Sequence, residues 1–168
     1  MRLTAEELAD LVDAYAPRLV MYARALCASP EDVVQEALSA LAAAPEPPVD
    51  AKAWLYRAVR NAALNASRGA RRRRRHEQEA GALRQEWFTP AADDAIDAAG
   101  ATAALADLPE PEREVVVLRL WSRMTFEQIA ELTGSSDSTA QRRYAAAIQS
   151  LRERLGWSCP QQTPPMKT

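Results

Sequence analysis

The chain has few of the residues that β-rich, disulfide-bonded or metal-binding proteins use. Only five of its 168 residues are glycine. Its two cysteines, Cys27 and Cys159, lie far apart and show no metal-ligand spacing, so we expect Cys27 to be a core thiol. β-Branched runs are scarce, and the main one, VVVL at 115–118, lies inside a helical pattern. These absences predict an all-α protein.

The sequence also lacks the motifs of most enzymes and membrane proteins. It has one histidine, His76, and it has no Gly-rich phosphate loop, Cys/His cluster or serine-elbow motif. No apolar run approaches the roughly 20 residues that a helix needs to cross a bilayer. The acidic, amphipathic start is unlike a signal peptide. We therefore expect a cytoplasmic protein without membrane insertion, without catalytic activity and without a metal or other cofactor.

The charges of the chain are segregated along the sequence. The net charge of −2 argues by itself against binding to nucleic acid. Residues 51–76, however, contain nine lysines and arginines and no carboxylate, whereas residues 77–114 contain ten carboxylates and two arginines. Such asymmetry indicates an electrostatic surface with separate basic and acidic parts. The basic part can neutralise several phosphates, so nucleic acid becomes a plausible partner.

Apolar spacing predicts helices in the first half of the chain. Thr4 and Glu7 form a capping box, so a helix is expected from residue 5, with a break or a kink at Pro17. The Ser-Pro pair at 29–30 opens a second helix. Three- and four-residue spacing places three polar side chains of that helix on one outer face. These are Asp32, Gln35 and Glu36.

A long basic helix is expected to follow three prolines at 45–48. Asp50 caps it, and it runs toward residue 74. Trp54 is expected to be a core anchor, whereas for Tyr56 both a core position and a base contact stay open, because an aromatic ring beside cations can stack on an unpaired base. The arginine run at 71–75 is as consistent with a solvated charged surface as with specific contact.

The segment 125–155 has the pattern of a helix-turn-helix. Thr125 and Gln128 form a capping box, Gly134 suits the end of that helix, and either Ser136 or Asp137 caps the next one. The first turns of the second helix of such a motif enter the major groove of DNA. They carry Ser138, Thr139, Gln141, Arg142 and Arg143. The alternative is an ordinary helical hairpin with a solvated polar face.

Three motifs in order resemble one known family. The segments DVVQEAL (32–38), WLYRAVRNAALN (54–65) and LPEPEREVVVLRLWSRMTFEQIAELTG (108–134) are similar to motifs of the extracytoplasmic-function (ECF) group of sigma-70 family RNA polymerase sigma factors. The resemblance covers roughly residues 8–155. It implies two small helical domains, a sigma2-like bundle at 1–76 and a sigma4-like helix-turn-helix domain at 91–156. It also implies a flexible linker at 77–90, and the lack of periodicity near the C-terminus predicts a disordered tail at 157–168.

The resemblance also implies partners and contact residues. Asp32, Gln35 and Glu36 dock on the β′ clamp of core RNA polymerase, whose β flap is a second contact, and an anti-sigma factor is a further expected partner. The −35 promoter element is read by the helix-turn-helix residues at 138–143. The −10 element is engaged and melted by the loop at 43–51 and the basic helix behind it. The helix residues implied are Lys52, Tyr56, Arg57, Arg60, Asn61, Asn65 and Arg68.

A second function remains open at this stage. A stand-alone transcriptional regulator would bind DNA through the same helix-turn-helix and use its first domain for dimerisation. That hypothesis explains the C-terminal half equally well, but it leaves the basic helix and the DVVQE face unexplained.

Charge reversal on the DVVQE face separates the two hypotheses. Asp32→Lys combined with Glu36→Lys is expected to abolish association with core polymerase while the DNA-binding domain stays folded, because only a sigma factor uses this face for docking. Pull-down with core polymerase and circular dichroism measure the two quantities. A variant that still binds polymerase like the unchanged protein would refute the docking role.

Overall fold

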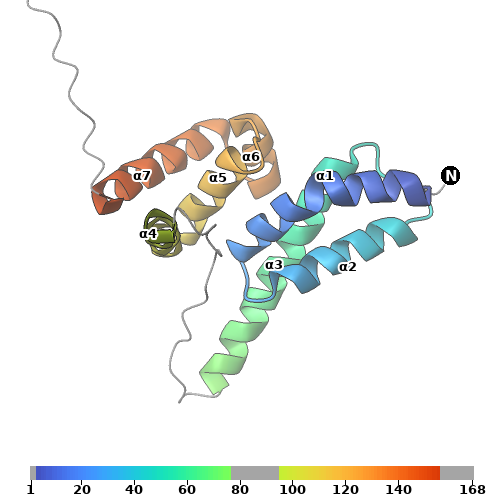
Figure 1. Ribbon diagram of the computed structural model, residues 1–168, viewed down its shortest axis with the longest axis horizontal. Helices are drawn as coiled ribbons and strands as arrows, with labels where there is room; N and C mark the ends of the chain where they lie inside the picture. Colours follow the sequence, from blue (N-terminus) through green and yellow to red (C-terminus); the bar gives the residue numbers. More distant parts are fainter. Residues whose placement is uncertain (1–2, 77–94, 156–168) are drawn as a thin grey trace, which may run out of the picture.

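The computed structural model describes residues 3–76 and 95–155. In these two ranges the chain forms seven helices and no strand, which confirms the all-α prediction. The first three helices form one group and the last four form a second group beside it, so the expected division into two helical domains is also confirmed (Figure 1). The linker at 77–90, the tail at 157–168 and Cys159 lie outside the described residues.

The first domain consists of α1 (Ala5–Arg24), α2 (Pro30–Ala43) and α3 (Ala51–His76). The predicted capping box is present, because the Thr4 hydroxyl accepts a hydrogen bond from the Glu7 backbone N–H at 3.2 Å and the Glu7 carboxylate accepts one from the Thr4 N–H at 2.8 Å. The Asp50 carboxylate accepts a hydrogen bond from the Ala53 N–H at 2.9 Å at the start of α3. Local capping chemistry therefore sets both helix starts.

α1 is one helix that continues through Pro17, where the sequence suggested a break or a kink. Pro17 has no N–H, so the carbonyl of Asp13 loses its helical partner. Asp13 is exposed, and water can satisfy that carbonyl. The buried Leu19, Tyr22 and Ala23 follow immediately and pack the last turns of α1 against the core. Tertiary packing thus outweighs the local cost of the proline.

The buried side of α3 contains Tyr56, whereas Trp54 was predicted to be the core anchor. Tyr56 is buried with 1% of its surface exposed, whereas Trp54 is only half-buried. Leu55, Val59 and Ala63 complete the buried stripe, and the helix continues past the glycine at 69. Helical periodicity does not show which other elements pack on a helix, and here Tyr22 of α1 and residues of the second domain pack around Tyr56.

The second domain consists of α4 (Ala95–Ala106), α5 (Glu110–Leu120), α6 (Phe126–Thr133) and α7 (Asp137–Leu155). The Thr125–Gln128 capping box starts α6, and Gly134 ends it with a φ of 66°, in the left-handed region that glycine adopts without strain. Of the two candidate caps for α7, Ser136 is the one used, because its hydroxyl accepts a hydrogen bond from the Thr139 N–H at 3.2 Å.

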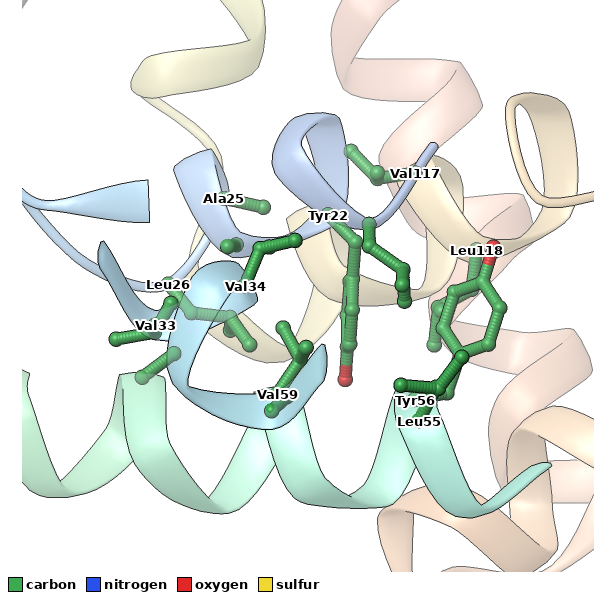
Figure 2. Packing of buried hydrophobic residues seen from close by; sticks show 14 of the residues in the cluster. Tyr22, Ala25, Leu26, Val33, Val34, Leu55, Tyr56, Val59, Val117 and Leu118 are labelled. Atoms are coloured by element: carbon green, nitrogen blue, oxygen red, sulfur yellow. The ribbon is translucent and has the colours of Figure 1, made fainter. Parts of the chain in front are cut away.

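Buried side chains of the two domains form one continuous apolar cluster. Tyr22 and Tyr56 of the first domain lie beside Val117 and Leu118 of α5 (Figure 2). The two tyrosine rings pack with their centroids 5.6 Å apart. Cys27 belongs to the same cluster, as expected for a core thiol. The two domains therefore pack directly against each other, through α1 with α5 and α3 with α6.

A smaller cluster of Leu108, Val116 and Ala147 holds the second domain together internally. Within the described ranges, none of the helices combines the length and the apolar character needed to cross a membrane.

The cap of α6 provides a test of this local structure. Thr125→Ala removes the side-chain acceptor of the Gln128 N–H and is expected to lower the free energy of unfolding by about 1 kcal/mol. Urea denaturation followed by circular dichroism measures the loss. Thr102→Ala, the same change in the interior of α4, is the control and is expected to have little effect, because alanine favours helix interiors. Equal losses in both variants would show that the capping hydroxyl has no special role.

Candidate functional site

The outer face of α2 presents the residues predicted to contact polymerase. Asp32, Gln35 and Glu36 are all exposed, while Val33 and Val34, which lie between them in the sequence, are buried. At the start of α2, Arg24 donates a hydrogen bond to the Glu31 carboxylate at 2.9 Å. This hydrogen bond is the main cause that lowers the pKa of Glu31, and a hydrogen bond from a backbone N–H lowers it further. The polar residues therefore share one surface with an ionised carboxylate at its edge.

A groove of about 330 Å³ lies between α1 and α2 along this face. Its walls are mainly apolar, and Gln35 is one of the polar residues that line it. The apolar lining residues are Leu8, Val12, Val20, Val34, Leu38 and Ala42. An apolar groove beside exposed carboxylates suits a partner helix with apolar and basic side chains.

The predicted −10 residues do not share one environment on α3. Four of them are exposed and form a row along the outer side of the helix, two are half-buried, and Tyr56 is buried between the domains. The exposed ones are Arg57, Asn61, Asn65 and Arg68, and the half-buried ones are Lys52 and Arg60. Beyond them a hollow of about 500 Å³ is lined by Asn65, Arg68, Arg71 and Arg72. The structure thus keeps a basic, amide-bearing surface open on the middle of α3, whereas Tyr56 near the start of the helix is buried.

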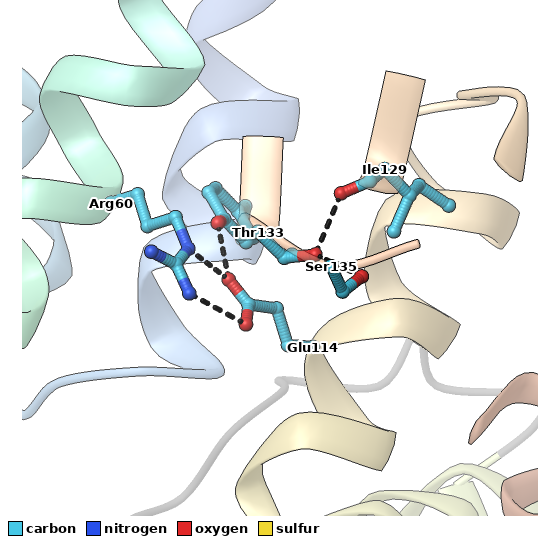
Figure 3. Close-up of polar contacts among 6 residues, drawn as sticks. Arg60, Glu114, Ile129, Thr133 and Ser135 are labelled. Carbon is cyan, nitrogen blue, oxygen red and sulfur yellow. Dashed lines mark hydrogen bonds and ion pairs between the residues drawn. The ribbon is translucent and has the colours of Figure 1, made fainter. Parts of the chain in front are cut away.

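Glu114 of α5 is the polar centre of the contact between the domains. It is 5% exposed, and its carboxylate accepts hydrogen bonds from Arg60 Nε at 2.8 Å and from the Tyr22 hydroxyl at 2.7 Å. A second Arg60 nitrogen, Nη2, reaches the other carboxylate oxygen at 3.3 Å (Figure 3). The buried charge is therefore paired and hydrogen-bonded on both oxygens, which is the condition for burying it without a large penalty.

Sequence reasoning missed Glu114 and Tyr22 as a pair. One signal for Glu114 was present, because the residue lies one turn before Leu118 and three residues before Val117, on the apolar side of α5. A carboxylate at an inward position needs a cationic or hydroxyl partner. The sequence did not show which of the many arginines supplies it.

Arg113 of α5 also connects the two domains. Arg113 Nε donates to the Ala25 carbonyl at 3.0 Å, at the end of α1, and its Nη1 donates to the Ala106 carbonyl at 2.9 Å.

Two tyrosines at the contact between the domains have raised pKa values. Burial raises the pKa of the Tyr22 phenol well above its ordinary value, and repulsion from Glu114 adds to the increase. Burial likewise raises the pKa of Tyr56.

The helix-turn-helix places its predicted DNA-contact residues on the first turns of α7. Ser138, Gln141 and Arg142 are exposed, and Thr139 and Arg143 are half-buried. The Gln141 amide donates a hydrogen bond to the Asp137 carboxylate at 2.7 Å. Ser138, Gln141 and Arg142 face outward, as a groove-reading helix requires, and Gln141 must exchange Asp137 for a base edge to read DNA with the same amide donor.

The turn between α6 and α7 is held by hydroxyl groups. Thr133 Oγ1 donates to the Ile129 carbonyl at 2.8 Å and lies 2.9 Å from the Ser135 hydroxyl (Figure 3). Ile129 is fully buried, so these bonds tie the turn to the core of the domain. In residues 3–76 and 95–155, no group of three or more His, Cys, Asp or Glu side chains is placed to hold a metal ion.

Comparison with known proteins gives matches for both domains. Residues 11–73 match the family model described as Sigma-70 region 2, and residues 101–151 match that described as Sigma-70, region 4. The RNA polymerase sigma factor SigV of Bacillus subtilis (strain 168) is 25% identical over 127 residues, which are 74% of each chain. A solved structure of the sigma factor RpoE with the anti-sigma factor NepR, from Bartonella quintana, aligns with a TM-score of 0.73 at 25% identity. That alignment covers 92% of this chain and 100% of the RpoE chain.

The raised pKa of Tyr22 predicts a loss of stability at alkaline pH. The fold favours the protonated phenol, so its contribution is fully present below the unfolded pKa of about 10 and is lost as the pH rises toward the higher folded value. Urea unfolding at a series of pH values measures this loss. Tyr22→Phe is expected to make the dependence above about pH 10 shallower, because it removes the titrating group. Tyr144→Phe, outside the Glu114 contact, is the control, and an equal change in both variants would contradict the assignment.

Proposed function

The chain belongs to the sigma-70 family of RNA polymerase sigma factors, in the extracytoplasmic-function group, and on this premise we propose that it binds core polymerase and directs it to promoters with distinct −10 and −35 elements. The observation that supports this most is the occurrence of both sigma regions, in order, on one fold that aligns with a sigma factor over 92% of the chain. In this role the protein acts in the bacterial cytoplasm at the nucleoid and catalyses no reaction itself.

The outer face of α2 is the proposed dock for the β′ clamp of polymerase. Asp32 and Glu36 supply exposed negative charge, and Gln35 lines the apolar groove between α1 and α2. A helix laid in that groove would bury its apolar side chains, while its basic residues would pair with the carboxylates. Charge complementarity of this kind speeds association and fixes the register of the docked helix.

The middle of α3 is the proposed −10 surface. Asn61 and Asn65 supply amide groups that hydrogen-bond base edges, and Arg68 supplies positive charge for the phosphates. Tyr56 provides an aromatic ring for stacking once it is accessible. In this proposal the first 76 residues therefore combine polymerase docking with contact to the strand that is opened.

The start of α7 is the proposed −35 reader. Arg142 is exposed and suited to a guanine edge, whereas Ser138 and Thr139 at the helix N-terminus are suited to phosphates. Residues 91–156 would carry this contact, with 77–90 as the connection to the −10 surface. Two DNA contacts on one chain raise the effective concentration of the second contact once the first has formed.

An anti-sigma factor is a proposed partner of the protein. The aligned RpoE structure contains the anti-sigma factor NepR. The groove between α1 and α2 offers a surface on which such a partner can mask polymerase binding.

Reconstitution tests the proposal directly. The protein mixed with bacterial core polymerase and genomic DNA is expected to yield transcripts whose start sites share two upstream elements, as sequencing of the products would show. Arg142→Ala is expected to weaken binding to those promoters by about 1–3 kcal/mol, because it removes a base contact. Arg152→Ala, an exposed arginine in the last turn of the same helix, is the matched control and is expected to bind like the unchanged protein. Failure to associate with core polymerase would refute the proposed function.

A further inference from the structure

A basic hollow lies where the turn between α1 and α2 meets α3 and α5 (Figure 1). Its volume is about 310 Å³, at the lower end of the range of roughly 300–1,000 Å³ that is typical of small-molecule sites. Four arginines line it, namely Arg24 of α1, Arg71 and Arg73 of α3, and Arg113 of α5. None of the described residues in its lining is a carboxylate. A hollow lined by charges of one sign concentrates ions of the opposite sign.

Two of these arginines are close enough to repel each other. Burial is the main cause that lowers the pKa of Arg113, and repulsion from Arg71 lowers it further, while attraction to Glu110 acts in the opposite direction. Like charges that share a site disfavour each other's charged form. An anion bound in the hollow would relieve this repulsion.

Two carboxylates outside the lining pair with these arginines. Arg24 lies 2.9 Å from Glu31, and Arg71 lies 3.2 Å from Glu110. The side chains of the first pair are 34% and 63% exposed, and those of the second are 74% and 35% exposed, so both pairs are weak and screened by salt. A guanidinium group has five N–H donors and can bind a phosphate besides a carboxylate. Among the described residues, no carboxylate pairs with Arg73.

Two serine hydroxyls add neutral donors to the lining. Ser29 directly precedes α2, and its side chain makes no capping hydrogen bond. Ser67 lies on α3, one turn before Arg71. Serine hydroxyls donate hydrogen bonds to phosphate oxygens, as arginines do. The hollow therefore combines charged and neutral donors of the kinds that bind phosphate.

We propose that this hollow binds the diphosphate group of a small molecule. A single phosphate group carries up to about two negative charges near neutral pH, so two linked groups match four guanidinium groups better than one does. The donors come from α1, α3, α5 and the turn before α2, and they surround a concave space. The exposed row of Asn61, Asn65 and Arg68, in contrast, follows one helix. The inference goes beyond the proposed function, because it assigns a ligand other than polymerase, DNA or an anti-sigma factor.

Titration with inorganic pyrophosphate tests the site in the full-length protein. Isothermal titration calorimetry is expected to show saturable binding of one pyrophosphate per chain. Inorganic phosphate is expected to bind about 10-fold more weakly or worse, because it lacks the charge-assisted hydrogen bonds of the second group. The absence of saturable binding, or equal affinity for the two anions, would overturn the inference.

Two adjacent arginines provide a matched pair of variants. Arg72 and Arg73 are both exposed on α3, but Arg72 lines the separate hollow that contains Asn65 and Arg68. Arg73→Ala is expected to weaken pyrophosphate binding about 10-fold, and Arg72→Ala is expected to change it less than about 2-fold. Both variants lose one positive charge and gain a strong helix former, so both are expected to fold. Equal losses would indicate diffuse attraction to the whole helix and would overturn the inference.

A third variant reduces the space in the hollow without changing the charge. Ala70 lines the hollow, and the longer side chain of Ala70→Gln would occupy part of it. This variant is expected to bind pyrophosphate about 10-fold more weakly or worse. Ala145→Gln, at an exposed position of α7, is the control and is expected to bind like the unchanged protein. With folding verified by circular dichroism, unaltered binding by Ala70→Gln would contradict the assigned location.

Competition distinguishes a small-molecule site from a site for the phosphates of DNA. The probe is fluorescein-labelled oligothymidylate, a single strand without promoter sequence, and the readout is anisotropy with and without saturating pyrophosphate. Sodium chloride keeps the ionic strength equal in both samples, because salt alone weakens binding to nucleic acid. Binding of the probe is expected to be the same in both. Displacement of the probe by pyrophosphate would assign the hollow to DNA and overturn the inference.

Discussion

The arrangement of the whole molecule depends on one buried carboxylate. Glu114 lies on the apolar side of α5, where an uncompensated charge would be costly, and Arg60 and Tyr22 of the other domain supply the hydrogen bonds that it needs. Because both partners belong to the first domain, the carboxylate is satisfied only when the domains are in contact. The apolar packing of Tyr22 and Tyr56 on Leu118 acts in the same direction.

This constraint gives α3 two alternative sets of partners. Its arginines match the carboxylates of the second domain in the described structure, and in the proposed function they match the phosphates of DNA. The side of α2 that we propose to face polymerase and the start of α7 are not involved in that exchange, because their predicted contact residues are exposed or half-buried. The proposed docking and −35 surfaces are thus structurally separate from the proposed −10 surface.

Local chemistry made much of the fold and part of the candidate site predictable. The capping boxes at Thr4 and Thr125 and the glycine at 134 mark helix ends through contacts within four residues, and the structure contains all of them. The exposed face of Asp32, Gln35 and Glu36 follows from helical spacing alone. Tyr56 was predicted to contact DNA and is buried, because residues far away in the chain, among them Tyr22 of α1 and Leu118 of α5, pack around it. The functional roles of these residues remain predictions.

The sequence by itself determined the capped starts of α1, α3 and α6 and the separation of positive charge on α3 from negative charge on α5, since each depends on neighbours along the chain. Only the tertiary structure decided which charges meet. Arg60 and Glu114 are 54 positions apart, and Tyr22 and Glu114 are 92 apart. No periodicity spans such distances, and several arginines were equally suitable partners by charge. The choice among them is made by the packing of α1 and α3 against α5, which brings one guanidinium and one phenol to the buried carboxylate.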